Sequence, residues 1–286
     1  VVSTDLLAEG VHFELGFGSV RLLGRKSLSV NLSDIASMGA IPRWFFLSLA
    51  IPGGFSLEAI EDFLDGLAEQ AAAHNCTLAG GDTCSSKGGL TISVTIMGEQ
   101  RPELILKRSG AQLGDDVWVS NTLGDSALGL QALLAGKRFD AADTYLLLRH
   151  LDPTPRCTLG RQLAESRLAS AMIDISDGLL ADLGHICEQS CCGAEIQLAD
   201  LPLSTAFRSH AAGQDAFPWA LAVSGGEDYE LCFTAPAANR LLIRQLAKTT
   251  GIQVSVVGKV TNSRQVQAIL PDGAVFNPAT SGYTHF

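Results

Sequence analysis

Polar and hydrophobic residues alternate along several short segments of the chain. Residues 91–97 (TISVTIM) alternate between polar and apolar side chains, which is the pattern of a strand with one buried face. Segments 117–119, 231–234 and 253–260 carry similar short patterns, and we predict strands there as well.

Other segments show the longer period of an amphipathic helix. In residues 56–74 the apolar side chains fall on one helical face, and residues 179–188 and 238–250 are further predicted helices, the last ended by Gly251. The tripeptide 271–273 (PDG) predicts a turn. Strands that alternate with helices predict an α/β protein.

Length and a change in composition suggest two domains. The 286 residues suffice for about two domains, each with its own core. A polar, glycine-containing segment at 108–115 precedes a new strand. We therefore predict an amino-terminal domain of residues 1–108 and a carboxy-terminal domain of residues 109–286.

Composition excludes several classes of protein. With 47% hydrophobic and 17% charged residues, neither disorder nor a coiled coil is expected. The net charge of −10 argues against nucleic acid or an anionic membrane as a partner. The longest apolar stretch, 44–52, has nine residues, whereas a membrane span needs about 20. The first residues, 1–5 (VVSTD), do not resemble a signal peptide, and because they lack an initiator Met we expect an upstream part to be missing.

The cysteines predict a reducing environment. Their number, seven, is odd, and they form no Cys-x-x-Cys pair, which fits neither a disulfide framework nor a zinc site. We expect free thiols in the cytoplasm, with adjacent Cys191 and Cys192 as a candidate redox-sensitive pair.

Acidic residues gather in five short motifs beside glycine, serine or threonine, several of them at predicted strand ends. The motifs are 3–5 (STD), 31–36 (NLSDIA), 80–83 (GGDT), 173–178 (IDISDG) and 224–229 (SGGEDY). Structural alternatives exist for Asp34 as an acid near a helix N-terminus, Asp82 as a turn residue and Asp177 as a helix cap. Asp174 and Asp177, however, flank one strand-to-helix turn and cannot both be its cap. Carboxylates accompanied by hydroxyls, without soft ligands, suit a hard cation such as Mg²⁺.

Positive charge is scarce near these motifs. The P-loop, Gly-x-Gly-x-x-Gly, Gly-x-Ser-x-Gly and His-Glu-x-x-His patterns do not occur, and none of the six lysines lies within an acidic motif. If the protein handles phosphates, metal ions must supply most of the positive charge. Arg108 is the best-placed basic candidate, with a surface arginine as the alternative. His12 is either a ligand-binding residue or a structural histidine.

The ordered set of motifs resembles the thiamine-monophosphate kinase family, within the aminoimidazole-ribonucleotide synthetase superfamily. The resemblance covers nearly the whole chain. Besides the five acidic motifs it includes residues 10–13 (GVHF), 108–111 (RSGA), 124–127 (GDSA) and 282–286 (GYTHF).

The resemblance implies a two-domain α/β (α+β) fold, with a mixed sheet and a dimer-forming barrel in the amino-terminal domain and an α/β sandwich in the carboxy-terminal domain. It implies a homodimer, with ATP between the two domains of a subunit. The implied reaction moves the γ-phosphoryl group of ATP to thiamine monophosphate, directly and in line. Both substrates are anions whose repulsion metal ions neutralise, and the acceptor oxygen is already ionised, so no strong base is needed.

The resemblance also assigns roles to residues. Several Mg²⁺ ions would be held by Ser3, Thr4, Asp5, Asp34, Asp82, Asp174 and Asp177. ATP would be contacted by Gly81, Asp82, Arg108 and Ser176. Thiamine monophosphate would be contacted by His12, Glu227 and Tyr283. The family also carries an upstream Gly-Asp-Asp-Ala segment with a further metal ligand, which precedes Val1; without it we expect weak metal binding, and with it a complete site.

Two alternatives stay open at this point. One is another ATP-dependent enzyme of the same superfamily, such as aminoimidazole-ribonucleotide synthetase, selenophosphate synthetase or the hydrogenase-maturation dehydratase, each of which needs a different acceptor pocket. The other is a non-catalytic protein that binds a nucleotide or thiamine phosphate. Turnover of ATP with thiamine monophosphate would separate them from the kinase.

Overall fold

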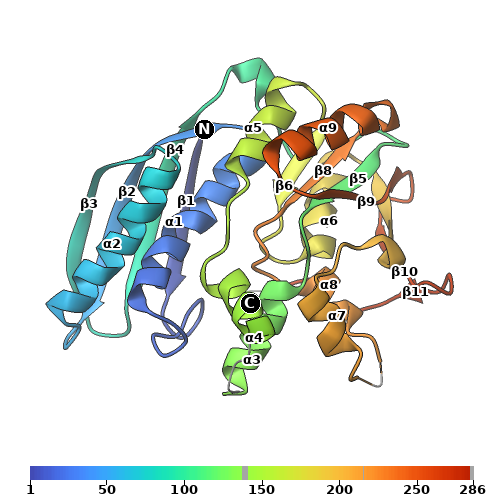
Figure 1. The fold of residues 1–286 in the computed structure, drawn as a ribbon. Helices are drawn as coiled ribbons and strands as arrows, with labels where there is room; N and C mark the ends of the chain where they lie inside the picture. Colours follow the sequence, from blue (N-terminus) through green and yellow to red (C-terminus); the bar gives the residue numbers. More distant parts are fainter. Residues whose placement is uncertain (137–140, 215, 284–286) are drawn as a thin grey trace.

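Two β-sheets with helices packed against them make up the computed structural model, which describes residues 1–136, 141–214 and 216–283 (Figure 1). Within these residues, four strands form a sheet in the order β1-β4-β2-β3, and seven form a second sheet in the order β11-β10-β7-β9-β5-β8-β6. Both sheets contain parallel and antiparallel pairs. The predicted α/β class is therefore confirmed.

Among the described residues, helices cover one face of the amino-terminal sheet (Figure 1). Its strands are β1 (Val2–Ala8), β2 (Ile41–Pro52), β3 (Thr77–Ser86) and β4 (Thr91–Glu99), and the covering helices are α1 (Val20–Ser37) and α2 (Leu57–Ala73). The alternation predicted at 91–97 is confirmed, since Ile92, Val94 and Ile96 are buried under the helices. β1 and β3 are the open edges, so a single chain forms no closed barrel within the described residues.

The carboxy-terminal sheet is covered on both faces. Its strands are β5 (Asp116–Ser120), β6 (Ala171–Asp174), β7 (Gly193–Gln197), β8 (Leu231–Ala235), β9 (Val254–Thr261), β10 (Val266–Ile269) and β11 (Val275–Phe276). Trp118 faces one core and stacks on Phe233, whereas Val117 and Val119 face the other. Because both faces are buried, β5 is apolar at consecutive positions.

The remaining helices include two that the sequence predicted, α6 and α9, and five that it did not. They are α3 (Asp125–Leu134), α4 (Ala141–Leu151), α5 (Cys157–Glu165), α6 (Leu179–Gln189), α7 (Thr205–Ala211), α8 (Trp219–Ser224) and α9 (Arg240–Thr250), with short 3₁₀ helices η1 (Pro102–Leu104), η2 (Leu198–Asp200) and η3 (Ala237–Asn239). The helices predicted at 56–74, 179–188 and 238–250 are confirmed, and Gly251 ends α9 with φ +70°. No described helix is long and apolar enough to cross a bilayer.

The segment 31–36 corrects one expectation. It does not open a helix but lies near the end of α1, which begins at Val20 after the capping residue Ser19. Asp34 is therefore close to the C-terminal end of α1, where the helix dipole disfavours a carboxylate. The alternative of Asp34 as a helix N-terminal acid is wrong.

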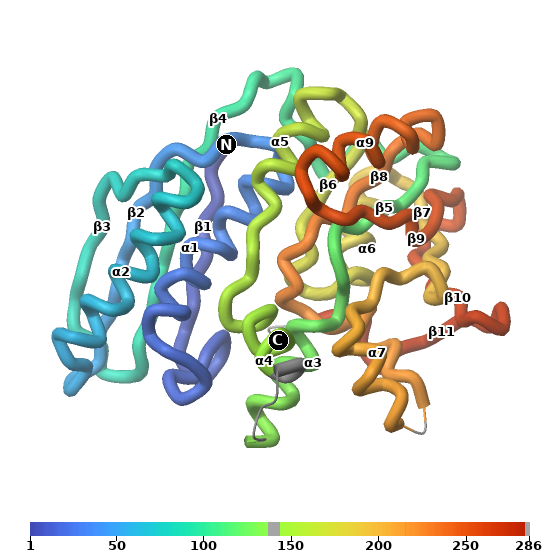
Figure 2. The backbone as a smooth tube through the Cα atoms, viewed as in Figure 1, coloured from blue at the N-terminus to red at the C-terminus, as the bar shows by residue number. Residues whose placement is uncertain are grey.

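α1 also joins the two sheets. It packs against β1 and β4 on one side and against α5 and β6 on the other, and Figure 2 shows α1 and α5 side by side between the sheets. A Cβ on Gly160 of α5 would lie 2.0 Å from the carbonyl oxygen of Ala36, so the close approach of these helices requires glycine. The two sheets thus share one hydrophobic core, and a division at residue 108 stays a prediction.

Candidate active site

A cleft of about 950 Å³ lies where β1 and α1 meet the loops that follow β6 and α8. It is lined by most of the side chains singled out in the sequence: Thr4, Asp5, His12, Asp34, Asp174, Ser176, Asp177, Glu227 and Tyr283. Residues from both ends of the chain therefore meet in one place. Of the resembling carboxy-terminal segment 282–286, residues 284–286 lie outside the described residues.

Three carboxylates from three elements lie close enough to influence one another. Asp5 comes from β1, Asp34 from the end of α1 and Asp174 from the end of β6. The Ser3 hydroxyl donates to Asp34 Oδ2, and the Ser33 hydroxyl donates to Asp174 Oδ2 at 2.6 Å. Serines of the acidic motifs thus fix the orientation of two of the three carboxylates.

The cleft raises the pKa of each of these acids. Burial, followed by the charge of Asp34, raises the pKa of Asp5 to about 7. Burial also raises the pKa of Asp34, although the Ser3 hydrogen bond and the Arg108 charge oppose it. For Asp174, burial and then the charge of Asp34 raise the pKa well above its usual range. Without a cation, the site holds negative charge at an energetic cost.

This donor set fits Mg²⁺. Carboxylates and hydroxyls are the hard oxygen ligands that Mg²⁺ prefers, and a cation would relieve the repulsion among the acids. Within the described residues, however, no three Asp, Glu, His or Cys side chains are arranged to hold a metal by themselves. The site therefore fits ions that take part of their coordination from water and substrate phosphates, as Mg²⁺ usually does.

The turn from β6 to α6 presents Asp177 to the cleft. The carboxylate of Asp182, in the first turn of α6, accepts hydrogen bonds from the backbone N–H groups of Ser176, Asp177 and Gly178 at 3.0–3.1 Å. Asp182 was not singled out in the sequence, yet it does the capping. The alternative of Asp177 as the helix cap is therefore wrong, and its side chain lines the cleft instead.

A second cluster of ionisable side chains surrounds Glu227, which also lines the cleft. Lys26 Nζ is 3.0 Å from Glu227 Oε1, and His150 Nδ1 is 3.2 Å from Glu227 Oε2. Burial raises the pKa of Glu227, but Lys26, by its charge and a hydrogen bond, outweighs burial together with the neighbouring histidines and holds that pKa below its usual range. Burial and the Lys26 charge lower the pKa of His150 to about 4. Glu227 is therefore a carboxylate beside a neutral imidazole.

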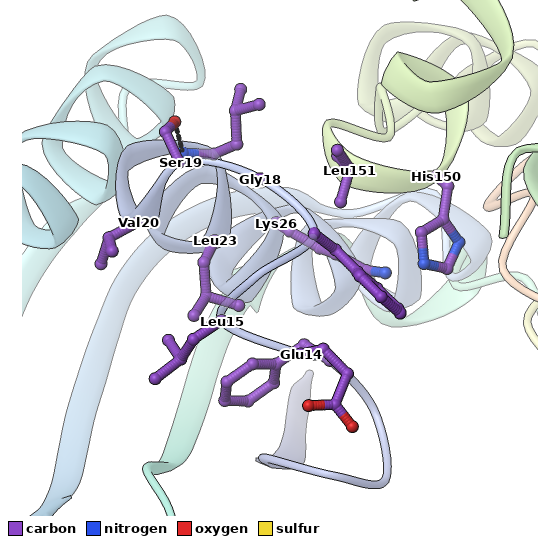
Figure 3. Close-up of a pocket in the computed structure, with 12 residues that line it drawn as sticks. Glu14, Leu15, Gly18, Ser19, Val20, Leu23, Lys26, His150 and Leu151 are labelled. Carbon is purple, nitrogen blue, oxygen red and sulfur yellow. Dashed lines mark hydrogen bonds between the residues drawn. The ribbon is translucent and has the colours of Figure 1, made fainter. Parts of the chain in front are cut away.

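Lys26 and His150 were missed in the sequence. Figure 3 shows both side chains in the wall of a small adjoining pocket, pointing toward each other. Lys26 lies outside the acidic motifs in sequence, but it stands four residues before Val30 and eight before Asp34, on the same face of α1. That spacing was the available signal, because Val30 and Asp34 also line the cleft.

The loop that carries Glu227 is held in an uncommon conformation. Glu227 and Tyr229 have φ values of +65° and +50°. The backbone N–H of Glu227 donates to the Ser176 carbonyl at 2.7 Å, and that of Tyr229 donates to the Ile175 carbonyl at 2.8 Å. These two bonds tie the Glu227 loop to the turn that carries Asp177, so the two ends of the cleft are built as one unit.

Gly81 and Asp82 lie elsewhere within one chain. Both belong to the edge strand β3, so the alternative of Asp82 as a turn residue is wrong. The register places Asp82 beside Ser48 of β2, three strands from Asp5, a separation of about 14 Å. A Cβ on Gly81 would lie 1.8 Å from the Leu47 carbonyl oxygen, which explains the glycine structurally.

Arg108 is an exposed residue outside the cleft lining, in the segment between the two sheets. Its charge nevertheless lowers the pKa of Asp34, so it lies near the acidic end of the cleft. The predicted nucleotide contacts of Gly81, Asp82 and Arg108 stay predictions.

Comparisons with known proteins agree along the whole chain. Residues 1–100 match the family model of the AIR synthase related protein, N-terminal domain, and residues 112–271 match that of the C-terminal domain. The thiamine-monophosphate kinase of Escherichia coli (strain K12) is 41% identical over all of this chain and 86% of its own length. That of Bacillus subtilis (strain 168) is 34% identical over all of this chain and 88% of its own.

Solved structures agree as well. The thiamine-monophosphate kinase of Stenotrophomonas maltophilia K279a, 42% identical, superposes with a TM-score of 0.88 over 96% of this chain and 86% of its own. The structure of AaThiL complexed with AMPPCP and TMP, 34% identical, superposes with a TM-score of 0.89 over 100% of this chain and 86% of its own. Hydrogenase maturation protein HypE, at 16% identity and a TM-score of 0.80, shares the fold over 99% of this chain and 90% of its own. The chain belongs to the thiamine-monophosphate kinase family.

Proposed function

We propose that this protein transfers the γ-phosphoryl group of ATP to the phosphate of thiamine monophosphate, giving thiamine diphosphate and ADP, the final step of thiamine diphosphate synthesis. The observation that carries the proposal is the cleft, in which acids from β1, α1 and the β6 turn face Glu227, His12 and Tyr283. The related structure of AaThiL complexed with AMPPCP and TMP supports the same pair of ligands here.

The residues singled out by the family resemblance divide, in this proposal, among the metal ions, thiamine monophosphate and ATP. Asp5, Asp34, Asp174 and Asp177, with the hydroxyls of Ser3 and Thr4 and with Asp82, would hold Mg²⁺ ions around the phosphates. Bound Mg²⁺ supplies the positive charge that lets two anionic substrates approach. His12, Glu227 and Tyr283 would bind the ring end of thiamine monophosphate, and Gly81, Asp82, Arg108 and Ser176 would contact ATP.

In this proposal the protein's side chains act mainly by positioning the two substrates. The acceptor phosphate oxygen is already ionised near neutral pH, so the reaction needs no strong general base. His150 is neutral near pH 7 and lies against Glu227. We therefore expect it to form part of the binding site and not to transfer protons during the reaction. The proposed mechanism is a direct in-line transfer in which bound geometry and electrostatics lower the barrier.

We also propose a homodimer that closes a barrel through the uncovered face of the amino-terminal sheet. That face carries exposed apolar side chains: Val2, Leu6, Trp44, Phe46 and Met97. A contiguous apolar sheet face of this kind is typical of an interface. Because Asp82 lies three strands from Asp5 within one chain, its proposed contact with ATP depends on how this face is paired.

The proposed place of action is the cytoplasm, where ATP is available. In support, all seven cysteines belong to the described residues and are free thiols. This fits a reducing compartment.

A product assay tests the proposed reaction. Purified protein is incubated with ATP, Mg²⁺ and thiamine monophosphate, and thiamine diphosphate is quantified by chromatography, with Asp177→Asn as the matched inactive control. Formation of thiamine diphosphate by the unmutated protein alone supports the kinase. Binding of both ligands without product in Mg²⁺ would instead show a non-catalytic binding protein.

A further inference from the structure

Lys26 is a buried cation on α1, about two helical turns before Asp34. Its side chain is only 3% exposed, and its ammonium group ends on Glu227. A buried ion pair is weak evidence for added stability, because removing both charges from water offsets much of their attraction. The ion pair between Lys26 and Glu227 is explained better by a role in keeping Glu227 ionised than by a gain in stability.

His150 completes the inner side of Glu227. Its Nδ1 lies 3.2 Å from Glu227 Oε2 and 3.1 Å from the Ser126 hydroxyl oxygen. The same ring nitrogen makes both contacts, so His150 lies between Glu227 and Ser126 of α3. One oxygen of Glu227 thus faces the ammonium group of Lys26 and the other faces the imidazole ring of His150.

The outer side of Glu227 faces the cleft. A quarter of its side chain, 25%, is exposed, and the residue lines the cleft. An ionised carboxylate offers about four acceptor positions, so those not used by Lys26 and His150 are available to a ligand. The titratable and charged groups that face Glu227 are Lys26 from α1, His150 from α4, His12 from the loop after β1, and Tyr229 on its own loop.

The chemistry of thiamine monophosphate then decides which ring meets Glu227. The thiazolium ring is a cation, but the charge of Glu227 is already balanced by Lys26, which makes the pair a poor counter-ion. The pyrimidine ring is neutral and carries an exocyclic amino group with two N–H donors. An acceptor-only carboxylate matches these donors and repels a carbonyl oxygen at the same place.

We propose that Lys26 and His150 keep Glu227 an acceptor-only carboxylate, and that this end of the cleft therefore selects the amino group of the pyrimidine ring over an oxo group at that position. Lys26 and His150 are positioning residues in this proposal, since they act through Glu227. The proposal rests on the proposed function and deepens it, because it names the part of the substrate that Glu227 recognises, the amino group of the pyrimidine ring.

The test compares thiamine monophosphate with its 4′-oxo analogue as phosphoryl acceptors. For the unmutated protein we expect kcat/KM to favour the amino compound by about 100-fold, because a site built around a substrate N–H rejects an analogue that lacks it. In Lys26→Met we expect the KM for thiamine monophosphate to rise about 10-fold or more near neutral pH, with a smaller change in kcat, and the preference to fall below about 10-fold.

The pH profile separates this role from a structural one. Without the ammonium group, burial favours protonated Glu227, so the KM for thiamine monophosphate in Lys26→Met should fall as pH rises. Lys26→Arg keeps the charge and should restore the preference. The KM for ATP should be unchanged in both variants.

Three results would overturn the proposal. The first is equal use of the two acceptors by the unmutated protein, a measurement that needs no variant to fold. The second is a Lys26→Met protein with full preference and a pH-independent KM. The third is a lack of turnover with either acceptor, which would overturn the proposed function and this inference with it, whereas turnover without preference overturns the inference alone.

Discussion

Asp5→Asn is expected to stabilise the metal-free protein at alkaline pH while abolishing phosphoryl transfer. Asp5 is mostly buried on β1, beside Asp34, and these two influences raise its pKa from 3.8 to about 7. Since the folded pKa is raised, the folded protein binds the proton more tightly than the unfolded chain does. The contribution of Asp5 to stability is therefore fully present below about pH 4 and is lost as pH rises through about 7.

The magnitude follows from that shift. One pKa unit corresponds to about 1.4 kcal/mol, so a rise from 3.8 to about 7 corresponds to about 4 kcal/mol as an upper value. Relaxation of the cleft and water entry reduce it, and we expect Asp5→Asn to raise the free energy of unfolding by about 2 kcal/mol at pH 8. Near pH 4 the two proteins should differ little, because Asp5 is then protonated.

Urea unfolding in the presence of a chelator measures this difference at both pH values. Asp65→Asn is the matched control, because Asp65 is 67% exposed and its pair with Arg21 should change stability by less than about 1 kcal/mol. Addition of Mg²⁺ should stabilise the unmutated protein and not Asp5→Asn. A loss of stability in chelated Asp5→Asn at pH 8 would refute the reasoning, because it would make Asp5 a structural carboxylate.

Three further substitutions test other parts of the account. Asp177→Asn should abolish thiamine diphosphate formation with an unchanged melting temperature, because Asp182 makes the cap; near-normal activity would remove Asp177 from the site. Glu227→Gln should raise the KM for thiamine monophosphate far more than that for ATP, and equal effects in steady-state kinetics would contradict its substrate role. Arg156→Met should lower the free energy of urea unfolding by about 3 kcal/mol, because fully buried Glu230 loses a partner at 2.7 Å; unchanged stability would show that Arg149 suffices.

The sequence pattern predicted the elements that have one buried face. β4 and the helices α2, α6 and α9 each bury one side, so their periods of two or about 3.6 residues are visible along the chain. α1 was misplaced because it is covered by β1 and β4 on one side and by α5 on the other. A helix that is buried nearly all round shows little polar face, so its start at Val20 left a weak signal.

The candidate site was predictable where its chemistry is local in sequence. Asp174 and Asp177 stand in one short motif, and the structure brings them to the cleft with Asp5 and Asp34. Lys26 could not be linked to Glu227 from the sequence, because their contact exists only once α1 packs against the loop that follows α8.

β3 illustrates a different limit. Its two glycines suggested a loop, but Gly81 is needed for the close approach of the Leu47 backbone within the sheet. The local pattern is compatible with both structures, and only pairing with β2 decides between them.

The central claim is that this cleft transfers a phosphoryl group directly from ATP to thiamine monophosphate. The most direct measurement uses ATP labelled at the γ-phosphate, Mg²⁺ and thiamine monophosphate, and follows the label by chromatography. We predict that the label appears in the terminal phosphate of thiamine diphosphate, with one ADP formed for each product molecule. Release of the label as inorganic phosphate, without labelled thiamine diphosphate, would contradict the account.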